Sequence, residues 1–165
     1  MRRTRAILLG LLLALVPSTP ATAAPPEVTA TLDGRSIPVS EIAEHDCDDL
    51  DFPLIRCFKN AADRDASVAR RLGALQVTVA TAVTYVTVFD LANYGGSSLN
   101  ISQNYDSLAV VGWNDKVSSF KGRNSESGRF YVDWFHGGSS WAFCCNQQTA
   151  NLGSYDNSFS SVYRT

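Results

Sequence analysis

Short β-prone runs separated by small polar residues fill the chain after residue 75. The stretch VTVATAVTYVTVF at 77–89 is rich in valine, threonine and aromatic residues, and SLAVVGW, RFYVDWF and SWAFCC follow it. Gly, Ser, Asn and Asp interrupt these runs at short intervals, as they do between antiparallel strands. The pattern is mainly β and predicts a β-sandwich over residues 76–165.

Two local signals distinguish residues 24–75 from the rest of the chain. VTATLDGRSIPV places Asp-Gly between two β-prone stretches, which predicts a small hairpin. A helix is predicted over about 61–72, because Asn60 is a good N-cap residue and Gly73 follows as a stop. Its apolar face is narrow, so it needs a neighbour to stay folded. This N-terminal extension is compatible with a propeptide, a clamp on the sandwich or a small module.

The first 23 residues have the features of a secretory signal peptide. Arginines at positions 2, 3 and 5 precede the apolar run ILLGLLLALV, and ATA at 21–23 offers small residues for cleavage. We expect cleavage after Ala23 and a secreted, extracellular protein. No later stretch has the roughly 18 uninterrupted apolar residues that a membrane helix requires.

The charge of the mature chain limits its partners. Removing residues 1–23 leaves 11 basic and 16 acidic side chains, a formal net charge of −5. Nucleic acids and anionic membranes require a basic surface. The sequence therefore predicts no nucleic-acid or membrane partner and favours cations as binding partners.

Four cysteines remain in this expected mature chain. An even number in an oxidising compartment indicates disulfides, and a zinc site is disfavoured because no CxxC spacing occurs. A bond between adjacent cysteines would close a strained small ring. Either Cys47 bonds to Cys57 while the adjacent pair stays free or finds another partner, or two bonds join the two cysteine-bearing segments. The four are Cys47, Cys57, Cys144 and Cys145.

The acidic stretch EHDCDDLD at 44–51 resembles a metal-binding loop in composition. An EF-hand loop would need glycine at its sixth position and glutamate at its twelfth, and neither is present. We therefore expect a solvated acidic loop closed by a disulfide.

A repeat of 42 residues organises the β-rich part of the chain. Glycines, aromatic residues and polar pairs recur at this offset, which predicts two packed copies of one unit at about 84–122 and 127–165. The matching segments are Gly95–Ser98 with Gly137–Ser140, Trp113 with Tyr155, Asn114–Asp115 with Asp156–Asn157, and Ser118–Ser119 with Ser160–Ser161.

The first copy carries a family resemblance. Phe89-x4-Tyr94-x-Gly96, followed about 23 residues later by Ser119, resembles a Greek key motif of the βγ-crystallin superfamily. The second copy has His136 where that motif usually has an aromatic residue, a departure that would weaken the second hairpin corner. The resemblance covers about residues 76–165 and implies a two-Greek-key β-sandwich. The resemblance is to the secreted bacterial calcium-binding type, which is related in fold to crystallin-like metalloproteinase inhibitors.

Both copies also match the calcium signature of that superfamily, N/D-N/D-x-x-S/T-S. NDKVSS at 114–119 and DNSFSS at 156–161 fit it at every specified position. Ca²⁺ prefers six to eight oxygen ligands at about 2.3–2.6 Å, which carbonyls, hydroxyls and Asp or Asn side chains supply. Such Asn/Asp pairs are also plain turn formers. Two repeat-related hexapeptides with intact serines nevertheless favour two calcium sites.

The resemblance implies a ligand set for each site. The third residue of the hexapeptide binds through its carbonyl and the fifth through its hydroxyl, and the opposite motif adds a carbonyl from the loop before its glycine. The first site would use Lys116 O and Ser118 with a carbonyl at Gly137 or the histidine before it. The second would use the equivalent residues with a carbonyl at Gly95 or the tyrosine before it. The metal-site candidates are Asn114, Asp115, Lys116, Ser118, Asp156, Asn157, Ser158, Ser160, Gly95 and Gly137.

The last serine of each hexapeptide, Ser119 or Ser161, is expected to hydrogen-bond back to its hairpin rather than to bind an ion. His136 is interpreted as a packed substitute for an aromatic residue, because no nucleophile with an oxyanion partner accompanies it. The chain contains no G-x-S-x-G, HExxH or P-loop motif. We therefore predict no catalytic residues and no organic cofactor. The tryptophans, Trp113, Trp134 and Trp141, are most simply core and rim residues.

Three functions are compatible with these motifs. The first is a secreted βγ-crystallin-like protein that Ca²⁺ stabilises. The second is a secreted proteinase inhibitor, specifically a metalloproteinase inhibitor, since some bacterial inhibitors resemble this fold. KGRNSESGR at 121–129 is basic and expected to be exposed, so it is the candidate inhibitory loop, although an ordinary linker would have the same composition. The third is a carbohydrate or cell-wall binder that uses exposed Trp and Tyr.

Overall fold

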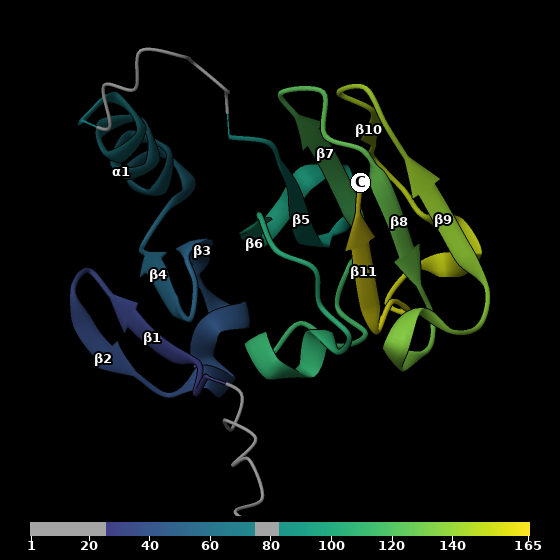
Figure 1. The fold of residues 1–165 in the computed structure, drawn as a ribbon, viewed down its shortest axis with the longest axis horizontal. Helices are drawn as coiled ribbons and strands as arrows, with labels where there is room; N and C mark the ends of the chain where they lie inside the picture. Colours follow the sequence, from purple (N-terminus) through teal and green to yellow (C-terminus); the bar gives the residue numbers. More distant parts are fainter. Residues whose placement is uncertain (1–25, 75–82) are drawn as a thin grey trace, which may run out of the picture.

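Two antiparallel Greek-key motifs and an N-terminal group of strands make up the fold, seen in a computed structural model that describes residues 26–74 and 83–165 (Figure 1). The predicted signal peptide lies outside the described residues. An eight-stranded sheet has the order β10-β7-β5-β6-β3-β4-β1-β2, and a three-stranded sheet has the order β11-β8-β9. No helix of the described residues is long and apolar enough to cross a membrane.

The two motifs exchange their third strands. β10 of the second motif pairs with β7 of the first, and Tyr105 of the first motif forms a bridge to Val162 in β11 of the second. The predicted mainly-β sandwich with two Greek keys is therefore confirmed. The strands are β5 (Tyr85–Leu91), β6 (Gly95–Ile101), β7 (Ser119–Arg123), β8 (Gly128–Tyr131), β9 (Ser140–Phe143), β10 (Gln148–Thr149) and β11 (Ser161–Arg164), and the 3₁₀ turns between them are η2 (Ala92–Tyr94), η3 (Leu108–Val111), η4 (Trp134–His136) and η5 (Gly153–Tyr155).

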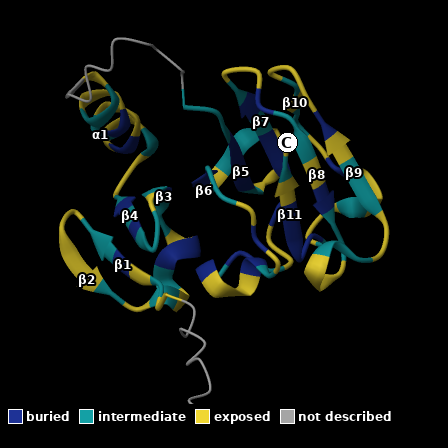
Figure 2. Cartoon of the chain, viewed as in Figure 1, coloured by how far each residue is buried: buried dark blue, intermediate teal, exposed yellow. Residues whose placement is uncertain are grey.

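An aromatic cluster fills the space between the two sheets. Phe130 is fully buried, and its ring lies 5.4 Å from that of Phe120, 4.9 Å from that of Phe143 and 5.1 Å from that of Phe159. Figure 2 shows buried residues gathered among the strands of the two motifs, with exposed residues along β2 and the outer loops. Large rings from both sheets interdigitate here and form the aromatic part of the core.

The N-terminal strands continue the first sheet of the sandwich. β3 pairs in parallel with β6, placing Cys47 opposite Leu99. The predicted hairpin is confirmed as β1 and β2, which are joined by Asp33 and Gly34 in the left-handed region (φ 49° and 82°). The elements of this part are β1 (Thr29–Leu32), β2 (Arg35–Ile37), η1 (Val39–Glu44), β3 (Asp46–Asp51), β4 (Leu54–Phe58) and α1 (Ala61–Ala74).

Helix α1 begins where its cap predicts. The Asn60 side chain accepts a hydrogen bond from Asp63 N–H at 2.9 Å and donates one to the Asp63 carboxylate at 2.8 Å. These bonds satisfy a backbone donor that the first turn leaves without a partner. The helix packs against β3 and β4 and buries Val68 and the Arg64 guanidinium, so it has the neighbour that its narrow apolar face requires.

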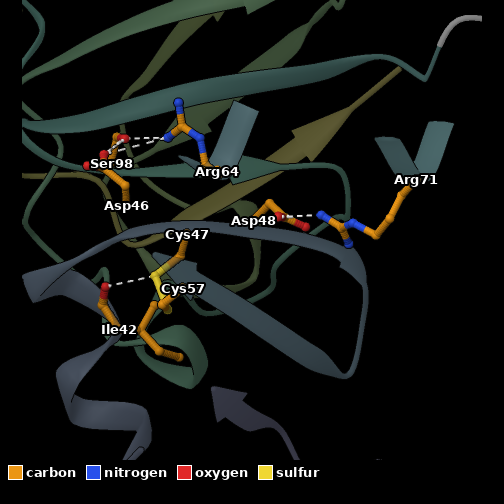
Figure 3. The surroundings of a disulfide bond; sticks show 8 residues. All are labelled: Ile42, Asp46, Cys47, Asp48, Cys57, Arg64, Arg71 and Ser98. Carbon is orange, nitrogen blue, oxygen red and sulfur yellow. Dashed lines mark hydrogen bonds and ion pairs between the residues drawn. A yellow bond between two sulfur atoms is a disulfide. The ribbon is translucent and has the colours of Figure 1, made fainter. Parts of the chain in front are cut away.

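The prediction of a solvated acidic loop at 44–51 is wrong. Residues 46–51 form strand β3, and the side chains of Asp48 and Asp49 are fully buried. Arg71 of α1 pairs with Asp48 at 2.6 Å, and Arg64 pairs with Asp46 at 3.7 Å, as Figure 3 shows. Burial raises the pKa of Asp48, and the ion pair with Arg71 opposes that rise. The Asp48 carboxylate can be buried because an arginine of α1 forms an ion pair with it.

One of the two disulfide arrangements left open by the sequence is present. Cys47 and Cys57 face each other on β3 and β4 and are bonded, with their Cα atoms 4.0 Å apart (Figure 3). Cys144 and Cys145 are exposed free thiols. A hydrogen bond to Cys145 raises the pKa of the Cys144 thiol, so the pair lacks the lowered pKa of a reactive thiolate.

Asp49 joins the N-terminal strands to the sandwich. Its carboxylate accepts hydrogen bonds from Ser102 N–H at 2.6 Å and from the Tyr105 hydroxyl at 2.9 Å. Burial raises the pKa of Asp49 to about 6, and these hydrogen bonds oppose that rise. The native state therefore keeps the Asp49 proton to a higher pH than the unfolded chain does.

This pKa gives the stability a defined pH dependence. A folded-state pKa above the unfolded value of about 3.9 contributes stability below that value, and the contribution is lost as pH rises through about 6. Between pH 4 and pH 7, Asp49 should lower the free energy of unfolding by about 2 kcal/mol. Urea unfolding of wild type and Asp49→Asn at both pH values, without calcium, measures this difference. A pH dependence that is the same in both proteins would contradict it.

Candidate calcium-binding site

Two folded hairpins, one in each motif, provide the walls of the candidate sites. In the first, Asn93 and Tyr94 adopt left-handed backbone conformations (φ 57° and 62°), followed by Gly96 at φ 71°. A Cβ at Gly96 would lie 1.9 Å from Asp90 Oδ1, so only glycine fits. Burial raises the pKa of Asp90, while a hydrogen bond from Ser97 N–H and the charge of Lys116 oppose that rise.

The second hairpin repeats this backbone conformation. Phe135 and His136 have φ values of 54° and 62°, and Gly138 has φ 70°. The His136 ring packs against Tyr131 and Tyr163, with centroids 5.4 Å away in each case. The interpretation of His136 as a packed aromatic substitute is confirmed, and the corner keeps the geometry of the first hairpin despite the substitution.

The last serine of each hexapeptide ties down its own hairpin. Ser119 Oγ donates to Leu91 O at 2.7 Å and accepts from Tyr94 N–H at 3.0 Å. Ser161 makes the same pair of contacts in the second hairpin, with Asp133 O and His136 N–H. Both hydroxyls are thereby used within the fold, as predicted, and both are unavailable to an ion.

The two hexapeptides cross each other at their second residues. Asp115 N–H donates to Phe159 O, and Asn157 N–H donates to Val117 O, both at 3.0 Å. Both second residues have left-handed backbones, with φ 55° at Asp115 and 52° at Asn157. Asp and Asn tolerate this conformation better than other residues that carry a side chain. The crossing carries each second side chain to the fifth residue of the other hexapeptide.

The first of the two resulting groups, the Asp115 cluster, contains Asn114, Asp115 and Ser160. Ser160 Oγ donates to Asp115 Oδ1 at 3.2 Å, and Asn114 Nδ2 donates to Asp115 Oδ2 at 2.6 Å. With Asp133 and Trp134 of the second hairpin, they line an open hollow of about 500 Å³. The cluster therefore holds oxygen atoms from both motifs, one of them from a carboxylate with an exposed position.

The second group, the Asn157 cluster, contains Ser118, Asp156 and Asn157. Ser118 Oγ donates to Asn157 Oδ1 at 3.2 Å, and Asn157 Nδ2 lies 3.5 Å from Asp156 Oδ2. Its central side chain is a neutral amide where the Asp115 cluster has a carboxylate. The two clusters thus have equivalent hydrogen bonds and one carboxylate each, but the carboxylate contacts the serine in the first and belongs to the residue before the contacting amide in the second.

The side chains of the remaining candidate residues do not belong to either cluster. Lys116 is exposed, and the Ser158 hydroxyl donates to Tyr155 O at 2.7 Å. Gly137 O accepts a hydrogen bond from Asp133 N–H within its own hairpin, and Gly95 pairs with Leu91.

The hydrogen bonds group these residues differently from the ligand sets that the resemblance implies. Ser118 N–H donates to Phe89 O, which lies next to the first hairpin, and Ser160 N–H donates to Tyr131 O, next to the second, both at 2.8 Å. Each fifth serine therefore lies beside the hairpin of its own motif. The part that comes from the opposite motif is the second side chain of the hexapeptide.

The candidate inhibitory loop at 121–129 is not an exposed loop. Most of this segment belongs to β7 and β8, and the connection between them exposes mainly Asn124 and Ser125. Glu126 is buried and pairs with Arg164 at 2.6 Å. The basic composition of the segment suggested exposure throughout, but both of its glycines lie in β7 and β8, and the exposed part of the connection is short.

One residue of the hollow was missed by the sequence interpretation. Trp113 is fully buried, as a core residue should be, whereas Trp134 is 56% exposed and lines the hollow. Its indole N–H donates to Asn114 Oδ1 at 3.0 Å. A break in the repeat could have indicated this, because Trp134-Phe135 stands where the first motif has Ala92-Asn93.

Solved structures similar to this chain match about half of it. No model of a known protein family matches the chain, and no curated protein matches it. A βγ-crystallin from an archaeon is 28% identical (TM-score 0.45) and covers 50% of this chain and 99% of its own. A βγ-crystallin from Ciona intestinalis is 27% identical (TM-score 0.45), and the match covers 49% of this chain and 99% of that one. A βγ-crystallin domain from Flavobacterium johnsoniae is 26% identical (TM-score 0.43), and the match covers 48% of this chain and 92% of that one. The strand topology of residues 83–165 is that of a βγ-crystallin-like fold.

Proposed function

We propose that this protein is a secreted calcium-binding protein in which Ca²⁺ stabilises the βγ-crystallin-like sandwich. The crossing of the two hexapeptides is the observation that carries the proposal. It brings Asp115 to within 3.2 Å of Ser160, which lies 45 positions further along the chain. Oxygen donors that are remote in sequence are thus already together before any ion binds, so binding need not order them. The proposal includes no catalytic activity.

The donor atoms in the clusters suit calcium. Both contain carboxylate, amide and hydroxyl oxygens, the ligand types that Ca²⁺ prefers. Within residues 26–74 and 83–165, no three His, Cys, Asp or Glu side chains come together, so an ion here would also need hydroxyl, amide and carbonyl oxygens. The Asp115 cluster would hold an ion through Asp115, Ser160 and the carbonyl of Ser158. The Asn157 cluster would hold one through Asn157, Ser118 and the carbonyl of Lys116.

The two sites should differ in affinity. A carboxylate attracts a divalent cation more strongly than a neutral amide does. Asp115 places its carboxylate directly beside Ser160, whereas Asn157 places an amide beside Ser118, and the Asp156 carboxylate of that cluster lies one position earlier in the chain. We therefore assign the tighter site to the Asp115 cluster.

Calcium should raise the melting temperature, and Ser160→Ala should reduce this rise more than Ser118→Ala does. At free Ca²⁺ about 100 times the dissociation constant, one site adds about 2.7 kcal/mol, enough to raise the melting temperature by several degrees. Thermal unfolding in chelator and in millimolar Ca²⁺, together with calorimetric titration, measures both effects. Ser154→Ala is the matched control, because its exposed hydroxyl precedes the second hexapeptide.

Two results would contradict the proposal in separate ways. An unchanged melting temperature between chelator and Ca²⁺ would exclude calcium as a stabilising ligand. Equal losses from Ser160→Ala and Ser118→Ala, with a titration that fits two identical sites, would exclude the assignment of the tighter site to the Asp115 cluster.

A further inference from the structure

The two hairpins have the same backbone but differ at their exposed tips. Trp134 and Phe135 are 56% and 73% exposed, and both belong to η4 of the second motif. The equivalent residues of the first motif, 42 positions earlier, are Ala92 and Asn93. Trp134 lies beside the Asp115 cluster and lines the same hollow, whereas the first motif has no aromatic residue at either equivalent position.

Stability does not account for Phe135. Its backbone has φ 54°, a left-handed conformation that disfavours bulky residues and that the first motif fills with Asn93 at φ 57°. The exposed ring adds little burial to offset this cost. Phe135 N–H nevertheless donates to Asp106 O at 2.8 Å, so the backbone is fixed and the ring is held out toward solvent. A fixed, exposed aromatic pair is typical of a surface that meets a ligand.

Polar acceptors surround this aromatic surface. Trp134 lines the same hollow as Asp115 and Asp133, whose exposed carboxylates can accept hydrogen bonds from hydroxyl groups. The hollow thus combines an apolar ring with several acceptors, which is the mixture found in small-molecule sites.

We infer that the hollow beside Trp134 binds an uncharged glycan, with the apolar face of a pyranose ring against the Trp134 indole and sugar hydroxyls donating to Asp133. A pyranose ring presents C–H groups on its face and hydroxyls around its edge, which matches a ring bordered by acceptors. The carboxylates in the hollow disfavour anionic polymers.

Few large apolar side chains are exposed on the described part of the chain. Within the described part of the chain, the exposed large apolar side chains are Leu91, Val110, Trp134, Phe135 and Tyr163. A stable interface buries about 800 Å² on each partner and involves about 20–30 residues. A site built from one or two rings and a few acceptors fits a sugar chain better.

Calcium should strengthen this binding through a chain of hydrogen bonds. Trp134 donates to Asn114, and Asn114 donates to Asp115, the residue that would bind the ion. An ion on Asp115 would fix Asn114 and, through it, the indole plane. Only this calcium dependence rests on the proposed function.

The test uses calorimetric titration and tryptophan fluorescence of the mature chain with hexasaccharides of N-acetylglucosamine, glucose and xylose, and with polygalacturonate as the anionic probe. We expect at least one neutral hexasaccharide to bind and to protect Trp134 from acrylamide quenching, and polygalacturonate not to bind. Trp134→Ala should weaken binding at least tenfold. Leu91→Ala, which removes an exposed apolar side chain from the first hairpin, should leave it unchanged. The calcium-induced rise in melting temperature should persist in Trp134→Ala.

Several outcomes would overturn the inference. The glycan site is excluded if the wild-type protein binds none of the neutral hexasaccharides. The calcium proposal stands in that case if the melting temperature still rises with Ca²⁺. Equal binding by wild type and Trp134→Ala would also exclude the glycan site. So would a dimer in size-exclusion chromatography that Trp134→Ala dissociates, because the aromatic surface would then belong to a second copy of the chain. Glycan binding that depends on Trp134 but not on calcium would support the glycan site and contradict its strengthening by calcium.

Discussion

Arg164→Ala is expected to lower the free energy of unfolding by about 3–5 kcal/mol, because it leaves the buried Glu126 carboxylate without a partner. Arg164 Nη2 lies 2.6 Å from Glu126 Oε2, and the same guanidinium donates to Ser102 O and Thr84 O. One side chain of the last strand therefore binds the inter-motif connection and the segments at both ends of the β5–β6 hairpin. Chemical denaturation at pH 7 measures the loss, which corresponds to a fall in melting temperature on the order of 10 °C.

A second variant separates the buried charge from the loss of contacts. Glu126→Gln combined with Arg164→Met replaces the ion pair by groups of similar size without a charge. The double variant should be more stable than Arg164→Ala alone, since no carboxylate is left unpaired in the interior. A loss of less than about 1 kcal/mol in Arg164→Ala would show that water reaches Glu126 in the native state and would contradict its burial.

Phe130→Ala is expected to lower the free energy of unfolding by about 3–5 kcal/mol. Phe130 lies among Phe120, Phe143 and Phe159, and its removal leaves a cavity that spans both sheets. Phe135→Ala is the matched control, because that ring is 73% exposed and its loss should change stability by less than about 0.5 kcal/mol. Similar losses in both variants would indicate that the aromatic cluster is not the core.

The 42-residue repeat predicted most of the sandwich and the equivalent positions of the two hexapeptides within it. Residues that match 42 positions apart make equivalent hydrogen bonds: Ser118 N–H donates to Phe89 O, and Ser160 N–H donates to Tyr131 O. Such contacts arise from local geometry within each motif, so a periodic sequence can reveal them. Helix α1 was predictable for the same reason, because its cap bond joins residues three positions apart.

Long-range partners could not be predicted in this way. Asp48 and Asp49 are buried because Arg71, Ser102 and Tyr105 meet them, and these partners lie 23 to 56 residues further along the chain. An acidic strand without these partners has the composition of a solvated loop. The crossing that brings Asp115 to Ser160 is also long-range, so the hexapeptides indicated the ligand types but not which side chains share a cluster.

The parallel pairing of β3 with β6 has a consequence for aggregation. A sandwich without the N-terminal strands would end at β6, whose seven residues would present unpaired backbone donors and acceptors to any other extended chain. With β3 in place, the eight-stranded sheet ends instead at β2, of three residues, and at β10, of two. Edges this short offer a poor template for pairing between molecules. We therefore expect the N-terminal strands to protect the first sheet from edge-to-edge pairing, and a chain cut between α1 and β5 that lost them to form intermolecular sheets more readily.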